Sequence, residues 1–338
     1  MPTLKVTSWN IEHMDRLFEE PSSETARRHR DARMEAVVQE VRDLDADVLA
    51  VLEGPRSESR ITDFCTNQLG GDWLPILAAD GDYDIRGTQG IWFLVKDALA
   101  ASCALQSPTT WKAFTGASWD VNYWGDFDTT QHRHYRHPQV LVLDLNGQRV
   151  EFIAAHLKSK FVRAGESDWN AGGERRQDFI RDAIKARIKL TTEASNIRAY
   201  IDAKFDQVAN PAIFLMGDLN DGPGKEYFEQ QFLFFDLLSV LQGDVFFAER
   251  FLNHALFDFA NHLRWSVEFE DFIDPSRNPH ILLDHILFTQ GLVDDSLPLV
   301  VESGAGLVEH EVHELIKATR FKYAHPNDHA PVSVVAEY

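Results

Sequence analysis

Residues 138–157 read PQVLVLDLNGQRVEFIAAHL, and this stretch decides the fold class. Two apolar runs flank Asn146 and Gly147, a residue pair that suits a two-residue type I′ turn. The stretch therefore predicts an antiparallel β-hairpin whose second strand ends near His156.

A strand–helix–strand unit is predicted nearer the start of the chain. Residues 4–9 (LKVTSW) and 46–54 (ADVLAVLEG) read as strands, and Met34, Val37 and Val41 recur between them at helical spacing. Because a crossover and a hairpin occur in one chain, we expect an α/β fold with mixed β-sheets.

Strands and helices alternate along the rest of the chain. Further strands are predicted at residues 89–96, 138–145, 149–157, 212–220, 281–289 and 331–338. Residues 174–205 carry a helical apolar stripe. The sequence contains no internal repeat, low-complexity tract or long linker, so we expect a single catalytic domain spanning residues 1–338.

Composition narrows the classes of function. The 338 residues are 44% hydrophobic and carry a formal net charge of −20, which opposes broad binding to a nucleic-acid backbone. Two cysteines are too few for a disulfide framework. There is no secretory signal and no run of about 18 apolar residues, so we expect a soluble, cytoplasmic protein without a membrane partner.

Polar side chains capable of binding metal or moving protons stand at or beside the ends of the predicted strands. They are Asn10, Glu53, His156, Asp218, Asn220, Asp284, His285, Asp328 and His329. One aspartate after a strand is more often a turn or a helix cap. So many together favour phosphate-ester cleavage, which needs a cation, a base for water and hydrogen-bond donors to phosphate oxygens. Scattered carboxylates suit Mg²⁺ better than a cysteine or histidine cluster would.

Six ordered motifs across nearly the whole chain carry a family resemblance. They are SWNIE, VLEG, AAHLKSK, GDLND, LLDHIL and NDHAPV. In this order they resemble the endonuclease/exonuclease/phosphatase superfamily, which includes abasic-site endonucleases and deoxyribonuclease I. The resemblance implies a four-layer α/β/β/α sandwich with two mixed β-sheets, and hydrolysis of a phosphate ester by in-line attack of water, dependent on Mg²⁺ or Mn²⁺.

The resemblance also implies catalytic roles for five residues. His329 would act as general base or as stabiliser of the attacked phosphorus group, and Asp284 would fix its tautomer. Asp218 would orient or deprotonate the water. Asn220 and His156 would donate hydrogen bonds to phosphate oxygens. Alternation along a strand would place the side chains of Asp218 and Asn220 on the same side.

The metal and substrate ligands follow from the same resemblance. Glu53 is the first expected metal ligand, with Glu12 and Asp328 completing the environment of the cation directly or through water. The expected substrate-binding residues are Asn10, Arg136 and Lys158. Two positions depart from the common family pattern: Leu52 stands where glutamine is common, and Asn327 where serine is common. Neither removes a catalytic group.

Two histidine-rich stretches offer rival interpretations. HRHYRH (residues 132–137) has the spacing of an HxHxDH zinc motif, but Arg136 replaces the aspartate and the apolar strand follows rather than precedes it. In EHEVHE, His310 and His313 are three apart rather than the four of a zincin, so we expect a solvated helix face.

The substrate class stays open between two alternatives. A nuclease is favoured by a basic cluster after His156 and by aromatic side chains able to stack on bases: Lys158, Lys160, Arg163, Trp119, Tyr123 and Trp124. A small-molecule phosphodiesterase or phosphatase, acting on a sugar, lipid or inositol phosphate, is favoured by the net charge of −20. A catalytically inactive binding module is disfavoured, because every expected catalytic group is present.

Overall fold

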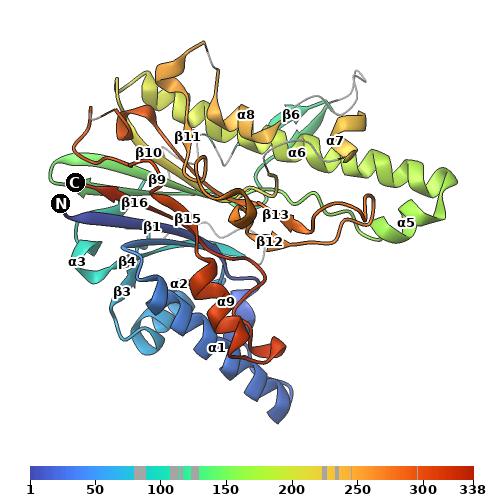
Figure 1. The fold of residues 1–338 in the computed structure, drawn as a ribbon, viewed down its shortest axis with the longest axis horizontal. Helices are drawn as coiled ribbons and strands as arrows, with labels where there is room; N and C mark the ends of the chain where they lie inside the picture. The colour runs from blue at the N-terminus through green and yellow to red at the C-terminus, as the bar shows by residue number, and fades with distance from the viewer. Residues whose placement is uncertain are drawn as a thin grey trace.

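The structure is a computed structural model that describes residues 1–79, 89–106, 114, 117–122, 129–222, 227–232, 236–244, 246–294 and 296–338. Two six-stranded sheets lie face to face with helices on their outer sides (Figure 1). Tyr123 and Trp124, considered above as stacking residues, lie outside the described residues.

The first sheet has the strand order β15-β16-β1-β2-β4-β3. Its strands are β1 (Thr3–Asn10), β2 (Val48–Gly54), β3 (Trp73–Pro75), β4 (Gly90–Lys96), β15 (Gly306–Val308) and β16 (Val332–Glu337). β1 and β2 are parallel and joined through α1 (Glu24–Leu44), which confirms the predicted crossover. β1 pairs antiparallel with β16, so the sheet is mixed.

The second sheet has the order β11-β14-β10-β9-β8-β5. Its strands are β5 (Cys103–Leu105), β8 (Gln139–Leu145), β9 (Gln148–His156), β10 (Ala212–Asp218), β11 (Asn253–His254) and β14 (Asp284–Phe288). The predicted hairpin joins β8 and β9, with φ of 53° at Asn146 and 85° at Gly147, as a type I′ turn requires. β9 and β10 are parallel and joined through α6 (Gly173–Phe205).

The remaining elements are short. Two small hairpins pair β6 (Trp119–Val121) with β7 (Thr130–His132), and β12 (Val267–Glu268) with β13 (His280–Ile281). The other α-helices are α2 (Glu58–Asp63), α3 (Asp97–Ala100), α5 (Gly165–Ala171), α7 (Tyr227–Phe232), α8 (Leu237–Gln242) and α9 (His310–Ala318). Single-turn helices are η1 (Met14–Phe18), η2 (Phe64–Gln68), η3 (Ala248–Arg250), η4 (Asn261–Leu263), η5 (Gln290–Leu292) and η6 (Lys322–Ala324).

The core has three apolar layers, and strand alternation sorts residues among them. Phe152 and Phe214 stack between the two sheets with ring centroids 5.2 Å apart. Their neighbours Ile153 and Leu215 face outward and pack with α6 and α8. The outer face of the first sheet packs in the same way against α1. This arrangement confirms the predicted four-layer sandwich.

One predicted strand is wrong in its extent. Residues 281–289 were expected to form one strand, but the chain leaves β13, in the two-stranded sheet with β12, at Ile281 and enters β14, in the second six-stranded sheet, at Asp284. The Ser266 hydroxyl accepts hydrogen bonds from the N–H groups of Leu283 and Asp284 at the crossing point. Hydrogen bonds to the Ser266 side chain therefore replace strand-to-strand hydrogen bonds at the N–H groups of Leu283 and Asp284.

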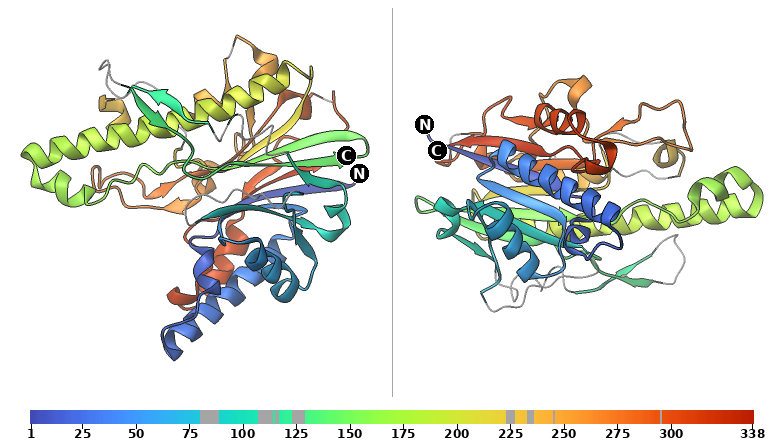
Figure 2. Two further views of the ribbon diagram at one scale, coloured as in Figure 1. Left: turned by 180° about the vertical axis from the view of Figure 1, so that it is seen from behind. Right: turned by 90° about the horizontal axis from the view of Figure 1, so that it is seen from below.

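The ends of the central strands place the site. β1, β2, β9 and β10 finish at one edge of the sandwich, where β14 and β16 begin. The two chain termini lie side by side at the opposite edge (Figures 1 and 2). Within the described ranges, no helix combines the length and apolarity needed to cross a membrane.

Candidate active site

Asp218 is the centre of the convergent strand ends. It is the last residue of β10 and is 2% exposed, and its register partners are His156 on β9 and Asp284 on β14. The Asn10 side-chain amide donates to Asp218 Oδ2 at 3.0 Å, and His156 Nε2 lies 3.3 Å from the same oxygen. Both sheets thus contribute to one carboxylate.

Asn220 reaches the site by a different route from the one expected. It lies beyond the end of β10 with φ of 54°, so strand alternation does not place it. Its backbone N–H donates to Asp218 Oδ1 at 2.9 Å, and its side-chain amide donates to the Leu157 carbonyl at 3.1 Å. Asn220 therefore ties the segment after β9 to the one after β10.

Asp284 and His329 form a second close pair. His329 Nδ1 and Asp284 Oδ2 are 2.7 Å apart, and Asp284 is 1% exposed. His329 precedes β16 and is held by a backbone bridge to Val267. Donor atoms of Asp218, Asp284 and His329 all lie within 4.8 Å of one another, so the fold brings together residues from three separate sequence motifs.

The electrostatics of this cluster follow from its burial. Burial raises the pKa of Asp218 to about 7, the Asp284 carboxylate adds to this rise, and His329 opposes it. Burial alone would lower the pKa of His329, but the carboxylates of Asp284, Asp218 and Asp328 together outweigh burial and raise that pKa to about 10. Burial, with Arg136 and His329 nearby, holds the pKa of His156 well below its ordinary value. The cluster therefore favours a neutral His156 and a protonated His329.

Glu53 stands on the other side of His156. It has φ of 54° within an irregularity in the β2–β4 pairing, which turns its side chain toward the site. Glu53 Oε1 lies 3.9 Å from His156 Nε2, while Oε2 accepts the His13 N–H at 2.9 Å.

Glu12 and Asp328 are exposed and flank this region. Arg33 links their segments, because its guanidinium donates to the carbonyls of Glu12 and Pro326. The negative charges of Glu12, Asp328 and Glu53 all act on the Arg33 guanidinium and oppose the lowering of its pKa by burial.

The family comparison decides the class of protein. The model of the Endonuclease/Exonuclease/phosphatase family matches residues 7–306. The chain belongs to this family. Membership confirms the predicted resemblance and makes the protein a hydrolase of phosphate esters.

Solved structures share the fold. A truncated Caenorhabditis elegans TDP2 is 13% identical with a TM-score of 0.53, over 99% of this chain and 98% of that one. A D. rerio TDP2 humanized by 14 mutations is 9% identical with a TM-score of 0.51, over 99% of each chain. A mannosyl-6-phosphatase of Bacteroides thetaiotaomicron VPI-5482 is 14% identical with a TM-score of 0.50, over 99% of this chain and 100% of that one. Such identities show the fold alone. Among curated protein sequences, none matches this chain.

The donor set of this family member fits a hard divalent cation. Asn10 Oδ1 and Asp284 Oδ1 are buried oxygens without a hydrogen-bond partner. Burying such acceptors unpaired is costly, and oxygen is the ligand that Mg²⁺ and Mn²⁺ prefer. Carboxylates from Glu53 and the Asp218 cluster stand beside them.

The two predicted basic substrate ligands, Arg136 and Lys158, differ in their hydrogen-bond partners. Arg136 Nε donates to Gln89 Oε1 at 2.6 Å, and burial lowers the pKa of Arg136 although Glu53 and Asp218 oppose this. The backbone N–H of Lys158 donates to Glu193 Oε2 at 2.8 Å. The Lys158 ammonium donates to the Ser159 carbonyl at 2.7 Å.

The rival histidine motifs have structural roles. His132 Nε2 lies 3.0 Å from Glu193 Oε1, and His134 Nε2 lies 2.9 Å from Asn196 Oδ1, so these two histidines pack their loop on α6 rather than converging on zinc. The prediction of a solvated face for α9 is wrong at His313, which is 1% exposed and bonds Glu40 on α1 at 2.7 Å.

Sequence reasoning missed a buried histidine relay behind the site. His254 Nδ1 accepts the Leu256 N–H, so its Nε2–H donates to His285 Nδ1 at 2.8 Å. His285 Nε2–H then donates to the Asp221 carbonyl at 2.7 Å. The relay holds the turn after β10. No local pattern marks His254, since its partner is 31 residues away.

Proposed function

We propose that the protein is a Mg²⁺- or Mn²⁺-dependent phosphodiesterase in which Asp218 and His329 activate water for in-line attack on phosphorus. The observation that carries this proposal is the buried Asp218–Asp284–His329 cluster at the meeting point of the strand ends. No fold requirement explains two buried carboxylates facing each other across β10 and β14. A catalytic requirement for neighbouring groups with displaced pKa values does explain them.

Each member of the cluster has a role that its contacts support. Asp284 accepts from His329 Nδ1, which fixes the imidazole orientation and leaves Nε2 for the reacting group. Asp218 takes the water proton, with Asn10 and the Asn220 N–H holding its two oxygens in place. His156 and Asn220 bind phosphate oxygens as the substrate displaces their present contacts.

The remaining assigned residues bind the metal and the substrate. Glu53, Glu12 and Asp328 would hold the cation, which supplies positive charge to offset the charge that develops on phosphate oxygens. Arg136, Lys158 and Asn10 would orient the substrate phosphate. Two observations support these roles. Glu53 lies beside His156. The negative charges of Glu53 and Asp218 act on the Arg136 guanidinium and favour its charged form.

Nucleic acid and small organic esters are the two substrate candidates. The nuclease candidate rests on the basic residues after His156. The small-ester candidate is favoured by the pairing of Lys160, whose ammonium bonds Asp221 and, at 3.0 Å, Glu229, which removes part of that basic cluster. We further propose one catalytic domain over residues 1–338 and a cytoplasmic location, the latter supported by two free cysteines.

The test compares bis(p-nitrophenyl) phosphate with p-nitrophenyl phosphate, with Mg²⁺ or Mn²⁺ and with chelator. We expect the diester to be cleaved, the chelator to abolish cleavage, and Asp218→Asn to lower kcat at least about 100-fold. Asp294→Asn, a change at an exposed residue outside all six motifs, is the matched control and should keep full activity. Full activity in Asp218→Asn would refute the assigned base, and turnover of the monoester alone would replace the phosphodiesterase with a phosphatase.

A further inference from the structure

A pocket opens directly beside Asn220. It has a volume of about 180 Å³ and lies between residues 179–187 of α6 and residues 269–283, and its lining includes Ser159 and Asn220. Figures 1 and 2 show the segment that joins β12 and β13 running alongside α5, where the α6 arm projects beyond the sheets. The pocket is therefore continuous with the site.

The lining of the pocket is dominated by phenylalanine rings. Phe179, which is buried, and Phe272, which is partly buried, meet with centroids 5.9 Å apart in its lining. Phe161 and Phe269 stand at its mouth and are 75% and 51% exposed. These two rings and Phe272 also line a wider groove of about 980 Å³. Rings this exposed contribute little to folding, and exposed apolar side chains grouped at a concavity mark binding sites.

The charges around the pocket are already compensated. Lys160 and Arg187 both contact Glu229, at 3.0 and 3.3 Å, and Arg277 lies 3.6 Å from Asp271. A second phosphate would have to compete with these carboxylates. The pocket is thus suited to an uncharged group rather than to the next phosphate of a polyanion.

We propose that this pocket is a substrate subsite for one uncharged aromatic ring attached to the phosphate held at Asn220. The inference rests on the proposed function and narrows its substrate to aryl-bearing phosphate esters. An engineered cavity of about 150 Å³ lined by leucine, isoleucine and phenylalanine binds benzene, so 180 Å³ suffices for one six-membered ring. Offset and edge-to-face contacts with the phenylalanines would favour a flat ring over an alkyl group.

The experiment measures binding rather than turnover, so that it does not depend on catalysis. Calorimetric titrations of the Mn²⁺-loaded protein compare benzylphosphonate with methylphosphonate, which share the charged group and differ in the ring. We expect benzylphosphonate to bind about tenfold more tightly, because its ring leaves water for the pocket. A third titration, with uridine 5′-monophosphate, compares the affinity for a pyrimidine base with the affinity for a phenyl ring.

Variants at the mouth of the pocket make the test specific. In Phe161→Ala/Phe269→Ala the ratio of methylphosphonate to benzylphosphonate dissociation constants should fall from about ten to about two. Phe257→Ala, which removes an 82% exposed ring outside the pocket lining, is the matched control and should leave the ratio unchanged. Because Phe161 and Phe269 are exposed, the double variant should fold.

The outcomes separate the subsite from the reaction. Equal affinities for the two phosphonates, or no measurable binding of either, overturn the subsite even if the diester is hydrolysed. A ring preference that the double variant loses supports the subsite even if hydrolysis is absent, in which case the proposed reaction alone fails. A preference that survives in the double variant places the ring elsewhere and also overturns the inference.

Discussion

Gly217 shows how one residue lets the two catalytic strands approach each other. It has φ of 146°, and a Cβ added there would lie 1.8 Å from the Ala155 carbonyl oxygen. Asp218 follows it directly. The glycine of the GDLND motif therefore permits the close contact of β9 and β10 that sets His156 beside Asp218.

We predict that Gly217→Ala lowers the free energy of unfolding by at least about 2 kcal/mol, because backbone strain and steric overlap add. Activity should fall as well, since Asp218 must move with the strand. Urea unfolding and diester hydrolysis provide the two measurements. Gly70→Ala is the control: Gly70 has φ of 76° but no atom within 4 Å of the added Cβ, so strain alone applies, at about 1 kcal/mol. Equal losses in both variants would contradict the argument.

At the residue scale, the sequence predicted the groups that end strands and missed those that act at a distance. Asp218 and His156 could be found because each ends a continuous apolar run. Glu193, Asp221 and His254 could not, because their contacts depend on how elements far apart in the sequence meet. Asn220 was identified from its motif, but strand alternation does not place it beside Asp218, because its backbone is left-handed and its N–H donates to Asp218.

Among the elements, the long apolar strands were predictable and the short edge strands were not. β1, β2, β4, β9 and β10 carry uninterrupted buried runs, whereas β5, β6, β7, β11 and β12 have only two or three residues each. Such short pairings are decided by neighbouring strands rather than by local sequence. The error at α9 has the same origin, because α1 covers the face of α9 that carries His313.

The contact between α1 and α9 gives a pH-dependent prediction. Glu40 is 0% exposed, and burial raises its pKa although His313 opposes the rise. A carboxyl whose pKa is raised in the folded state contributes stability that is complete below its ordinary pKa and is lost as pH rises through the folded value. Glu40→Gln keeps an acceptor for His313 but does not titrate. The stability of this variant relative to wild type should therefore increase between pH 5 and pH 8.

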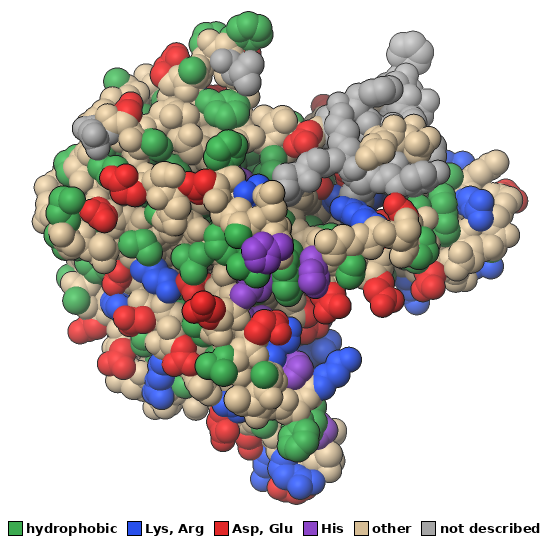
Figure 3. Space-filling model, in the orientation of Figure 1, with side chains coloured by type: hydrophobic (Ala, Val, Ile, Leu, Met, Phe, Trp, Pro, Cys, Tyr) green, Lys and Arg blue, Asp and Glu red, His purple; other side chains and the backbone are tan. Residues whose placement is uncertain are grey.

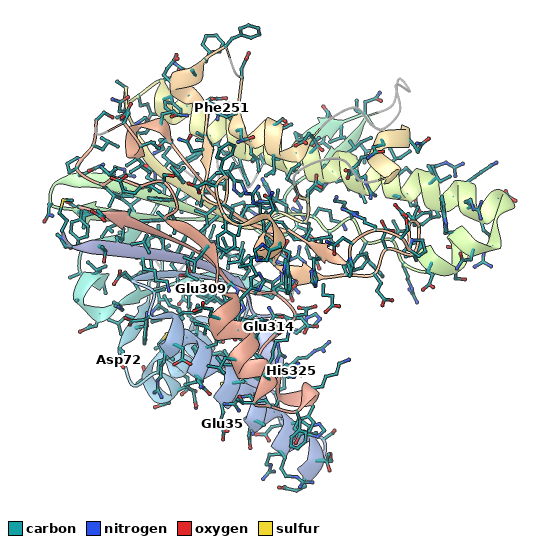
Figure 4. All side chains as sticks on the ribbon, in the orientation of Figure 1. Glu35, Asp72, Phe251, Glu309, Glu314 and His325 are labelled. Carbon is teal, nitrogen blue, oxygen red and sulfur yellow. The ribbon has the colours of Figure 1, made fainter. Side chains whose placement is uncertain are left out.

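The measurement is urea unfolding of both proteins at several pH values. Glu35→Gln on the same helix is the control, since the Glu35 side chain is 74% exposed (Figure 4), and its difference from wild type should stay constant with pH. A relative stability of Glu40→Gln that falls as pH rises would reverse the sign expected from burial.

The charge of the whole molecule bears on which substrates it admits. With a net charge of −20 and Lys160 paired, the protein offers little attraction to a polyanion. Figure 3 shows acidic side chains spread widely over the face of the molecule viewed there.

We predict that kcat/KM for bis(p-nitrophenyl) phosphate changes less than about twofold between 50 and 200 mM salt, because one phosphate releases few counterions. Initial rates at low substrate give this ratio directly. The contrary result would be cleavage of a single-stranded oligonucleotide with a kcat/KM similar to that for the diester. If that kcat/KM also fell tenfold or more over the same salt range, the substrate would be one held through several phosphates.

The pairing of β1 with β16 has a consequence for how the protein is made. The Trp9 indole donates to the His329 carbonyl across 320 residues of sequence, and β1 lies between β2 and β16 in its sheet. During translation one edge of β1 stays unpaired until β16 (Val332–Glu337) has left the ribosome. Such long-range closure slows folding and exposes the nascent chain to aggregation. A fragment that ends before residue 329 therefore lacks both His329 and the strand that pairs with β1, so we expect it to be inactive.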